Sequence, residues 1–156
     1  YHPEFYAKFK AWADDYFFIP HRNETRGVGG VFYDHQKATI DVSKEQLLQF
    51  ALDLGDVFAQ LYEHQYEMGV SKEYSEEHLK WRKLRRGRYV EFNLVHDRGT
   101  QFGLKTGGRI ESILMSLPET ASWVYDYKPV ANSDEEKTLS WLKKDIDWLS
   151  MSTHGM

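Results

Sequence analysis

Residues 81–100 read WRKLRRGRYVEFNLVHDRGT, and this stretch decides the predicted fold. Across residues 88–95, apolar and polar side chains alternate, which is typical of a half-buried β-strand. The two faces of that strand would be formed by Val90, Phe92 and Leu94 on one side and by Tyr89, Glu91 and Asn93 on the other. If the alternation continues, Asp97 joins the polar face. We therefore predict a strand that leads into a turn at residues 96–98.

Three more strands are expected on either side of this stretch. Residues 28–33 follow a glycine-rich approach, residues 109–117 stop at Pro118, and residues 122–127 could form their hairpin partner. Short connections between strands, mixed with helices, favour an α+β fold with an antiparallel sheet. We expect a single domain over residues 1–156.

Helices are predicted where capping residues precede an apolar stripe. The first starts at Pro3 and ends near residue 15, and another ends before Gly87 after starting near Ser75. Two further helices begin with capping-box patterns. The helix that Ser43 and Gln46 start runs to Gly69. The helix that Ser133 and Glu136 start carries Leu139, Leu142 and Ile146 on its inner face.

The composition excludes several kinds of function. The 156 residues include no cysteine, so this chain forms no disulfide and ligates no iron–sulfur cluster. The net charge of -4 argues against a dedicated nucleic-acid binder, although the basic run from Lys80 to Arg98 would attract a small anion. No apolar run is long enough to span a membrane. The sequence begins at Tyr1 without a Met, which suggests part of a longer chain.

The segment HRNETRGVGG, from His21 to Gly30, is the first candidate site. In an extended chain Arg22, Glu24 and Arg26 share one face, so the carboxylate lies between two guanidinium groups. Such a group could bind an anion beside glycines that admit a ligand. The alternative is a structural ion network that leads into a strand, and spacing alone favours that alternative.

The turn formed by His96, Asp97 and Arg98 is the second candidate site. An aspartate next to an arginine stays ionised, accepts hydrogen bonds from N–H donors and leaves the arginine free to bind a carboxylate. A surface turn with an ordinary ion pair is an equally good interpretation.

The glycine-rich segment from Gln101 to Pro118 is the third candidate, as a loop that could cover a site. Its glycines lack the spacing of a nucleotide-binding loop. Arg109 and Glu111 would share a strand face and could simply pair with each other. The seven histidines show no metal-binding spacing, so no metal site is predicted.

Taken together and in order, three strings resemble the signature segments of the oxygen-dependent coproporphyrinogen III oxidases. They are YFFIPHRNETRGVGGVFYD, RRGRYVEFNLVHDRGTQFGL and GGRIESILMSLP. The resemblance covers nearly the whole chain and places it in the C-terminal part of the family's domain. It implies a large antiparallel β-sheet flanked by α-helices, which would be incomplete in this sequence.

The resemblance also implies an activity. Such enzymes oxidatively decarboxylate two propionates of coproporphyrinogen III to vinyl groups, which gives protoporphyrinogen IX in haem synthesis. They use O2 as co-substrate and no metal or organic cofactor, usually as a homodimer. A porphyrin-binding module without turnover is the alternative, because the family's N-terminal half is not in this sequence. A third, weaker hypothesis is an unrelated protein whose basic segment from Lys80 to Arg88 contacts RNA or an acidic partner.

The family's motifs map onto particular residues of this chain. Asp97 matches an essential aspartate and would bind pyrrole N–H groups and assist their deprotonation, while Arg98 would orient a propionate or stabilise developing peroxide. Substrate-binding roles are expected for His21, Arg22, Arg26, Asn93, Gly107 and Arg109. One departure is His96, where the family often has tyrosine. We expect a cytoplasmic protein, with the mitochondrial intermembrane space as the alternative, that binds no nucleic acid.

Overall fold

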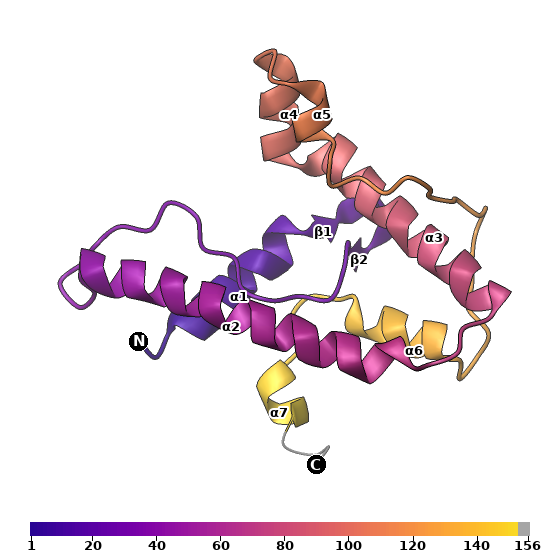
Figure 1. Ribbon diagram of the computed structural model, residues 1–156, viewed down its shortest axis with the longest axis horizontal. Helices are drawn as coiled ribbons and strands as arrows, with labels where there is room; N and C mark the ends of the chain where they lie inside the picture. The colour runs from indigo at the N-terminus through magenta and orange to yellow at the C-terminus, as the bar shows by residue number, and fades with distance from the viewer. Residues whose placement is uncertain (153–156) are drawn as a thin grey trace.

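The computed structural model describes residues 1–152, which are mostly helical (Figure 1). In chain order the elements are α1 (Phe5–Tyr16), β1 (Phe18–Ile19), η1 (Pro20–Arg22), β2 (Glu24–Thr25), α2 (Lys44–Val70), α3 (Glu76–Glu91), η2 (Phe92–His96), α4 (Arg98–Lys105), α5 (Ile110–Ile113), α6 (Asp134–Trp141) and α7 (Trp148–Ser152). The long helices α2 and α3 dominate the view, and α4 and α5 project beyond the end of α3.

The prediction of a large antiparallel sheet is wrong for this part of the chain. Within residues 1–152 the sheet consists of β1 and β2, a short antiparallel pair in which Phe18 lies opposite Thr25 and Ile19 opposite Glu24. Residues 28–33 and 122–127 form no strand, and residues 109–117 contain α5 followed by turns. The class is therefore helical with a minimal sheet, as far as residue 152.

The strand predicted at residues 88–95 is helix, because a second periodicity fits the same residues. Leu84, Arg88 and Phe92 recur every four residues, and all three are buried. Spacing of four places side chains on one face of a helix. Once the helix starts at its Ser75 cap, extending it adds a backbone hydrogen bond per residue, so α3 continues past Gly87 into the π-helical turn η2.

The predicted helix starts are confirmed where a capping serine marks them. Ser43 and Ser75 each form a capping box, with Gln46 and His78 as the reciprocal partners. Ser133 accepts a hydrogen bond from the Glu136 amide at 3.2 Å. The last of these helices ends at Trp141, so Ile146 lies beyond it. α1 starts at Phe5, two residues after Pro3.

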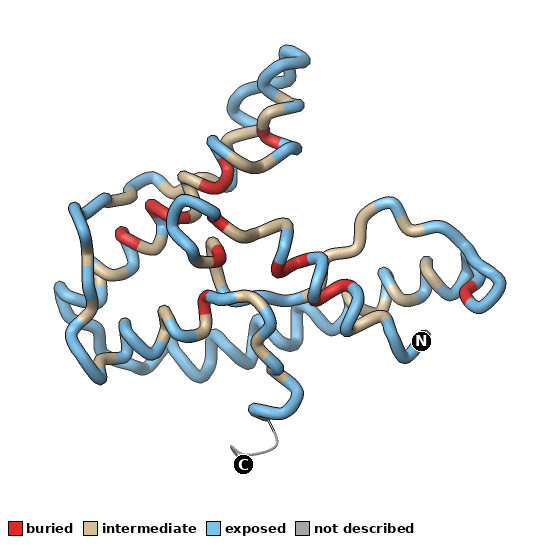
Figure 2. The backbone as a smooth tube through the Cα atoms, turned by 180° about the vertical axis from the view of Figure 1, so that it is seen from behind, coloured by how far each residue is buried: buried red, intermediate tan, exposed pale blue. Residues whose placement is uncertain are grey.

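Most of the buried residues lie on α1, the β1–β2 hairpin, α3 and η2 (Figure 2). The buried apolar residues there are Phe9, Ala13, Ile19, Leu84 and Phe92, whereas Val42 lies just before α2 and Leu142 directly follows α6. Burial of one phenylalanine contributes about 1.5–3 kcal/mol. The hairpin is also tied to the C-terminal part of the chain, because the Thr25 amide donates to the Leu142 carbonyl oxygen at 2.9 Å. This core fixes the start of the 18–30 segment against α3.

α2 contributes little to this core. None of its 27 residues is buried, and its apolar side chains remain exposed over much of its length. Ring contacts of Phe50 with Phe5 and Phe9 hold it against α1. Within residues 1–152, no helix is both long and apolar enough to cross a membrane. The single domain over residues 1–156 remains a prediction, and residues 153–156 lie outside the described part.

Candidate functional site

Asp97 caps the N-terminus of α4 and is held by three hydrogen bonds. Its Oδ2 accepts from the Thr100 amide at 2.7 Å and from the Thr100 hydroxyl at 2.8 Å. Its Oδ1 accepts from the Tyr16 hydroxyl at 2.9 Å. Burial acts to raise the pKa of Asp97, but these hydrogen bonds and the charge of Arg26 outweigh it, so the pKa is lowered. Asp97 is therefore a fixed carboxylate.

Arg98 lies next to this carboxylate and stacks on Tyr16, with its guanidinium carbon 4.8 Å from the ring centroid. Among the described residues, no carboxylate pairs with Arg98. Its side chain borders a cavity of about 240 Å³ that is also lined by Lys8, Trp12 and Phe32. Tyr16 thus contacts both residues that the sequence placed in the catalytic turn.

Arg26 is enclosed by aromatic rings. Its guanidinium carbon lies 4.1 Å from the Phe17 centroid, 4.8 Å from that of Phe92 and 5.1 Å from that of Tyr89. Burial lowers the pKa of Arg26, although the charges of nearby groups including Asp97 act in the opposite direction. A stacked guanidinium keeps its edge N–H groups available for a carboxylate.

The expected network in which Glu24 lies between Arg22 and Arg26 does not form. Glu24 instead accepts from Arg85 at 3.0 Å and pairs with Arg88 at 3.1 Å. The strand β2 is too short to bring residues 22, 24 and 26 onto one extended face, because residue 22 belongs to η1. Two cations of the basic run on α3, Arg85 and Arg88, are consequently paired with Glu24 of the hairpin.

Glu91 is the centre of a second polar cluster. It accepts from Arg22 Nε at 2.9 Å, from His21 Nε2 at 3.2 Å and from Trp123 Nε1 at 2.7 Å. The hydrogen bond with Arg22 is the main reason that the pKa of Glu91 falls to about 2. His96 in turn stacks on His21, with ring centroids 5.3 Å apart.

The remaining predicted residues lie away from Asp97 or have structural partners. Asn93 of η2 is buried and donates to the Tyr89 carbonyl oxygen of α3 at 2.8 Å. Gly107 adopts a positive φ of 71° in the turn between α4 and α5. Arg109 is exposed, and its closest carboxylate is Glu111 at 3.9 Å. Their substrate-binding roles remain predictions.

Sequence reasoning missed Tyr16, Thr100, Lys8 and Trp12, of which Trp12 is 45% exposed. Thr100 had a local signal, because an aspartate at a helix N-cap accepts from the backbone N–H of the residue three positions later. Tyr16 had none, since 81 residues separate it from Asp97.

Metal binding has no support in the described part of the chain, where no three His, Asp or Glu side chains gather closely enough to hold an ion. That a reaction proceeds without metal or cofactor remains a prediction. Of the seven histidines, His154 lies outside the described residues. The polar groups on hand are carboxylates, arginines and imidazoles, which suit an anionic ligand with N–H donors.

Comparison with known proteins decides the family. The family model for coproporphyrinogen III oxidase matches residues 1–148. The chain belongs to this family. Coproporphyrinogen-III oxidase 1, chloroplastic, of Arabidopsis thaliana is 50% identical to it over 147 residues. The chloroplastic oxygen-dependent coproporphyrinogen-III oxidase of Hordeum vulgare is 51% identical over 147 residues, and the mitochondrial one of Rattus norvegicus is 48% identical over 148.

These alignments cover 94% of this chain but only 37% of the two plant oxidases and 33% of the rat oxidase. The chain thus spans about a third of the length of its coproporphyrinogen oxidase relatives. The names of these relatives place them in chloroplasts or mitochondria, and the expectation of a cytoplasmic protein is therefore wrong.

Proposed function

We propose that this chain carries the reacting centre of a coproporphyrinogen III oxidase. The observation that carries the proposal is the fixed, ionised carboxylate of Asp97 between Tyr16 and Thr100, with Arg98 and Arg26 close by. Membership of the family supports the substrate, coproporphyrinogen III. Two cations that pair with no carboxylate of residues 1–152, close to a hydrogen-bond acceptor, match a ligand that has both carboxylates and pyrrole N–H groups.

The reaction sets the chemistry that the site has to supply. Each of two propionates, –CH2CH2COO⁻, becomes a vinyl group and releases CO2, one proton and two electrons. Molecular oxygen accepts the electrons and ends as a reduced oxygen species. The protein must therefore hold the propionates, raise the electron density of a pyrrole and accept or guide protons.

Asp97 has one acceptor position left for the pyrrole. A carboxylate has about four lone-pair sites, and the three hydrogen bonds from Tyr16 and Thr100 occupy one on Oδ1 and two on Oδ2. The free site lies on Oδ1. There Asp97 accepts a hydrogen bond from a pyrrole N–H and assists its deprotonation, which makes the ring more reactive toward oxygen.

Arg98 and Arg26 supply positive charge. Both have an aromatic ring against the guanidinium face, so their edge donors are oriented before a ligand arrives. Fixed donors can hold the carboxylate of a propionate in place and stabilise negative charge that develops on a peroxide. His21 and Arg22 are bound to Glu91, so in this proposal they support the wall of the site.

The direct test is oxygen-dependent turnover. The protein is incubated with coproporphyrinogen III under air and under argon, with a strong chelator in both, and the products are separated after oxidation to fluorescent porphyrins. Protoporphyrin formed under air alone supports the proposal, including chemistry that needs no metal ion. Binding of the tetrapyrrole without turnover under air would instead favour a porphyrin-binding module.

The proposal extends to location and partners. We place the protein in a chloroplast or mitochondrion, as the names of the relatives suggest, and fractionation of the source cells tests this. We also propose a homodimer, for which the exposed apolar side chains of α2 offer surface, with sedimentation as the test. Nucleic acid is not expected as a partner, since Arg85 and Arg88 of the basic run are already paired with Glu24.

A further inference from the structure

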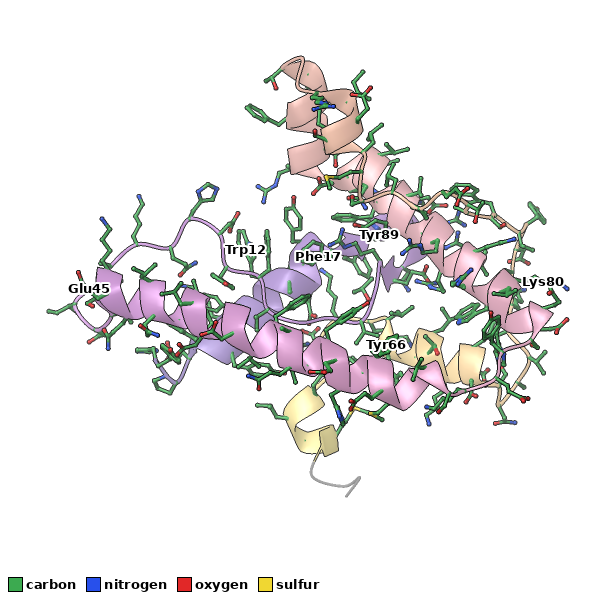
Figure 3. The ribbon with its side chains drawn as sticks, in the orientation of Figure 1. Trp12, Phe17, Glu45, Tyr66, Lys80 and Tyr89 are labelled. Atoms are coloured by element: carbon green, nitrogen blue, oxygen red, sulfur yellow. The ribbon has the colours of Figure 1, made fainter. Side chains whose placement is uncertain are left out.

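A cavity bordered by Arg98, the residue that follows Asp97, has the properties of a binding site. It has a volume of about 240 Å³ and lies between α1 and residues 32–36, with Arg98 at its border. Figure 3 shows the Trp12 side chain projecting above α2, beside the loop that follows β2. Phe9, which is 1% exposed, closes the cavity from the core side. The cavity therefore has an apolar floor and an exposed aromatic wall.

The charges around the cavity favour an anion. Lys8 and Arg98 both line it, and within the described residues neither is paired with a carboxylate. The negative charge at the cavity is Asp34, whose carboxylate lies 3.6 Å from His35 Nε2. Two cations thus face a single carboxylate that has a histidine beside it.

The geometry of Arg98 narrows the class of anion. Its guanidinium face is covered by Tyr16, so its N–H groups are directed along the guanidinium plane. That arrangement suits the bidentate binding of a carboxylate. A cavity of this size is smaller than the ~300–1,000 Å³ that drug-sized ligands require, so it can hold only one edge of a large ring system.

We propose that this cavity is a subsite for one pyrrole ring of the tetrapyrrole and its propionate. Trp12 and Phe32 contact the ring, while Lys8 and Arg98 hold the carboxylate. Because Tyr16 contacts both Arg98 and Asp97, the subsite lies next to the carboxylate that receives the pyrrole N–H groups. The identity of the ligand rests on the proposed function.

The test measures binding rather than turnover. Coproporphyrin III, the stable oxidised form of the substrate, is titrated into the protein, and the dissociation constant is read from porphyrin fluorescence anisotropy. Lys8→Gln removes one charge-assisted hydrogen bond and should weaken binding about tenfold. Trp12→Ala should weaken it about fivefold through lost ring contact.

Two further variants serve as controls. Lys8→Arg keeps the charge and should restore most of the affinity. Lys37→Gln makes the same change of charge at an exposed residue next to the 32–36 loop. Lys37 does not line this cavity, so its replacement should change the affinity less than twofold. If Lys8→Gln and Lys37→Gln behave alike, or if coproporphyrin III does not bind, the subsite is refuted.

The outcomes separate this inference from the proposed function. Suppose that Lys8→Gln binds coproporphyrin III more weakly than the parent protein, and that the parent protein does not turn over coproporphyrinogen III. This result would support the subsite and reject the oxidase activity. If instead the parent protein turns over coproporphyrinogen III but Lys8→Gln and Lys37→Gln bind coproporphyrin III with equal affinity, the oxidase activity is supported and the subsite is rejected.

Discussion

Replacing Glu91 with glutamine should destabilise the protein in a pH-dependent way. The side chain is 12% exposed and accepts hydrogen bonds from Arg22, His21 and Trp123, so it joins η1 and the 119–124 segment to α3. Glutamine keeps the size of the side chain but removes the charge and one acceptor oxygen. The partners would then be left with weaker or unsatisfied hydrogen bonds.

The magnitude follows from the pKa of Glu91. The fall of the pKa from its ordinary value of 4.5 to about 2 corresponds to a maximum of about 3 kcal/mol of stabilisation, since one pKa unit is worth about 1.4 kcal/mol. Because Arg22 is 36% exposed, solvent screening reduces the expected contribution to about 2 kcal/mol. The folded pKa lies below the unfolded one, so this stabilisation is complete above about pH 4.5 and is lost as the pH falls toward 2.

The assay is urea unfolding followed by tryptophan fluorescence at several pH values. The difference in the free energy of unfolding between the parent protein and Glu91→Gln should be about 2 kcal/mol at pH 6 and should fall by more than half by pH 3. Glu63→Gln, the same change on the exposed surface of α2, should stay within about 0.5 kcal/mol at every pH. An equal effect of the two variants, or a Glu91→Gln difference that does not change with pH, would refute the reasoning.

Three further predictions concern the packing and the site. Gly87→Ala should destabilise the protein by about 1–3 kcal/mol, because the added Cβ would lie 2.5 Å from the Ser122 carbonyl oxygen. Gly55→Ala should stabilise it by about 0.5–1 kcal/mol, because a Cβ there meets no described atom within 4 Å. Thermal unfolding measures both variants, and equal shifts of the melting temperature would contradict the prediction. Tyr16→Phe removes a hydrogen bond that lowers the pKa of Asp97, so the acid limb of kcat/KM should move to higher pH, and an unchanged limb would be evidence against the contact. Arg26→Lys loses the planar stacking on three rings and should lower the free energy of unfolding by about 1–2 kcal/mol. Calorimetry measures this, and an unchanged free energy of unfolding would show that the stacking contributes nothing.

The parts of the fold that local signals determine were predictable from the sequence. A serine that caps a helix acts within three residues, so the starts at Ser43, Ser75 and Ser133 were found. The 88–95 segment was not, because a short run of residues can satisfy the periods of a strand and of a helix at once. Packing decided between them, and it buried Arg88 and Phe92 on one helical face.

The site was predictable only in part for the same reason. Asp97 and Arg98 were identified from a resemblance in sequence, and the turn that holds them has a local capping pattern. Tyr16 could not be assigned, because its contact with Asp97 joins residues that are far apart in the chain. The pairing of Glu91 with Arg22 likewise depends on how α3 crosses the hairpin, which no local spacing encodes.

The most direct test of the account is the kcat/KM of Asp97→Asn with coproporphyrinogen III under air. Asparagine caps a helix as well as aspartate does, so α4 should stay folded while the charge at Oδ1 is lost. The matched control is Asp56→Asn on the exposed surface of α2. The account predicts a fall of about 100-fold or more for Asp97→Asn, the scale of a lost general base, and no change for the control. Near-normal turnover by a folded Asp97→Asn protein would contradict it.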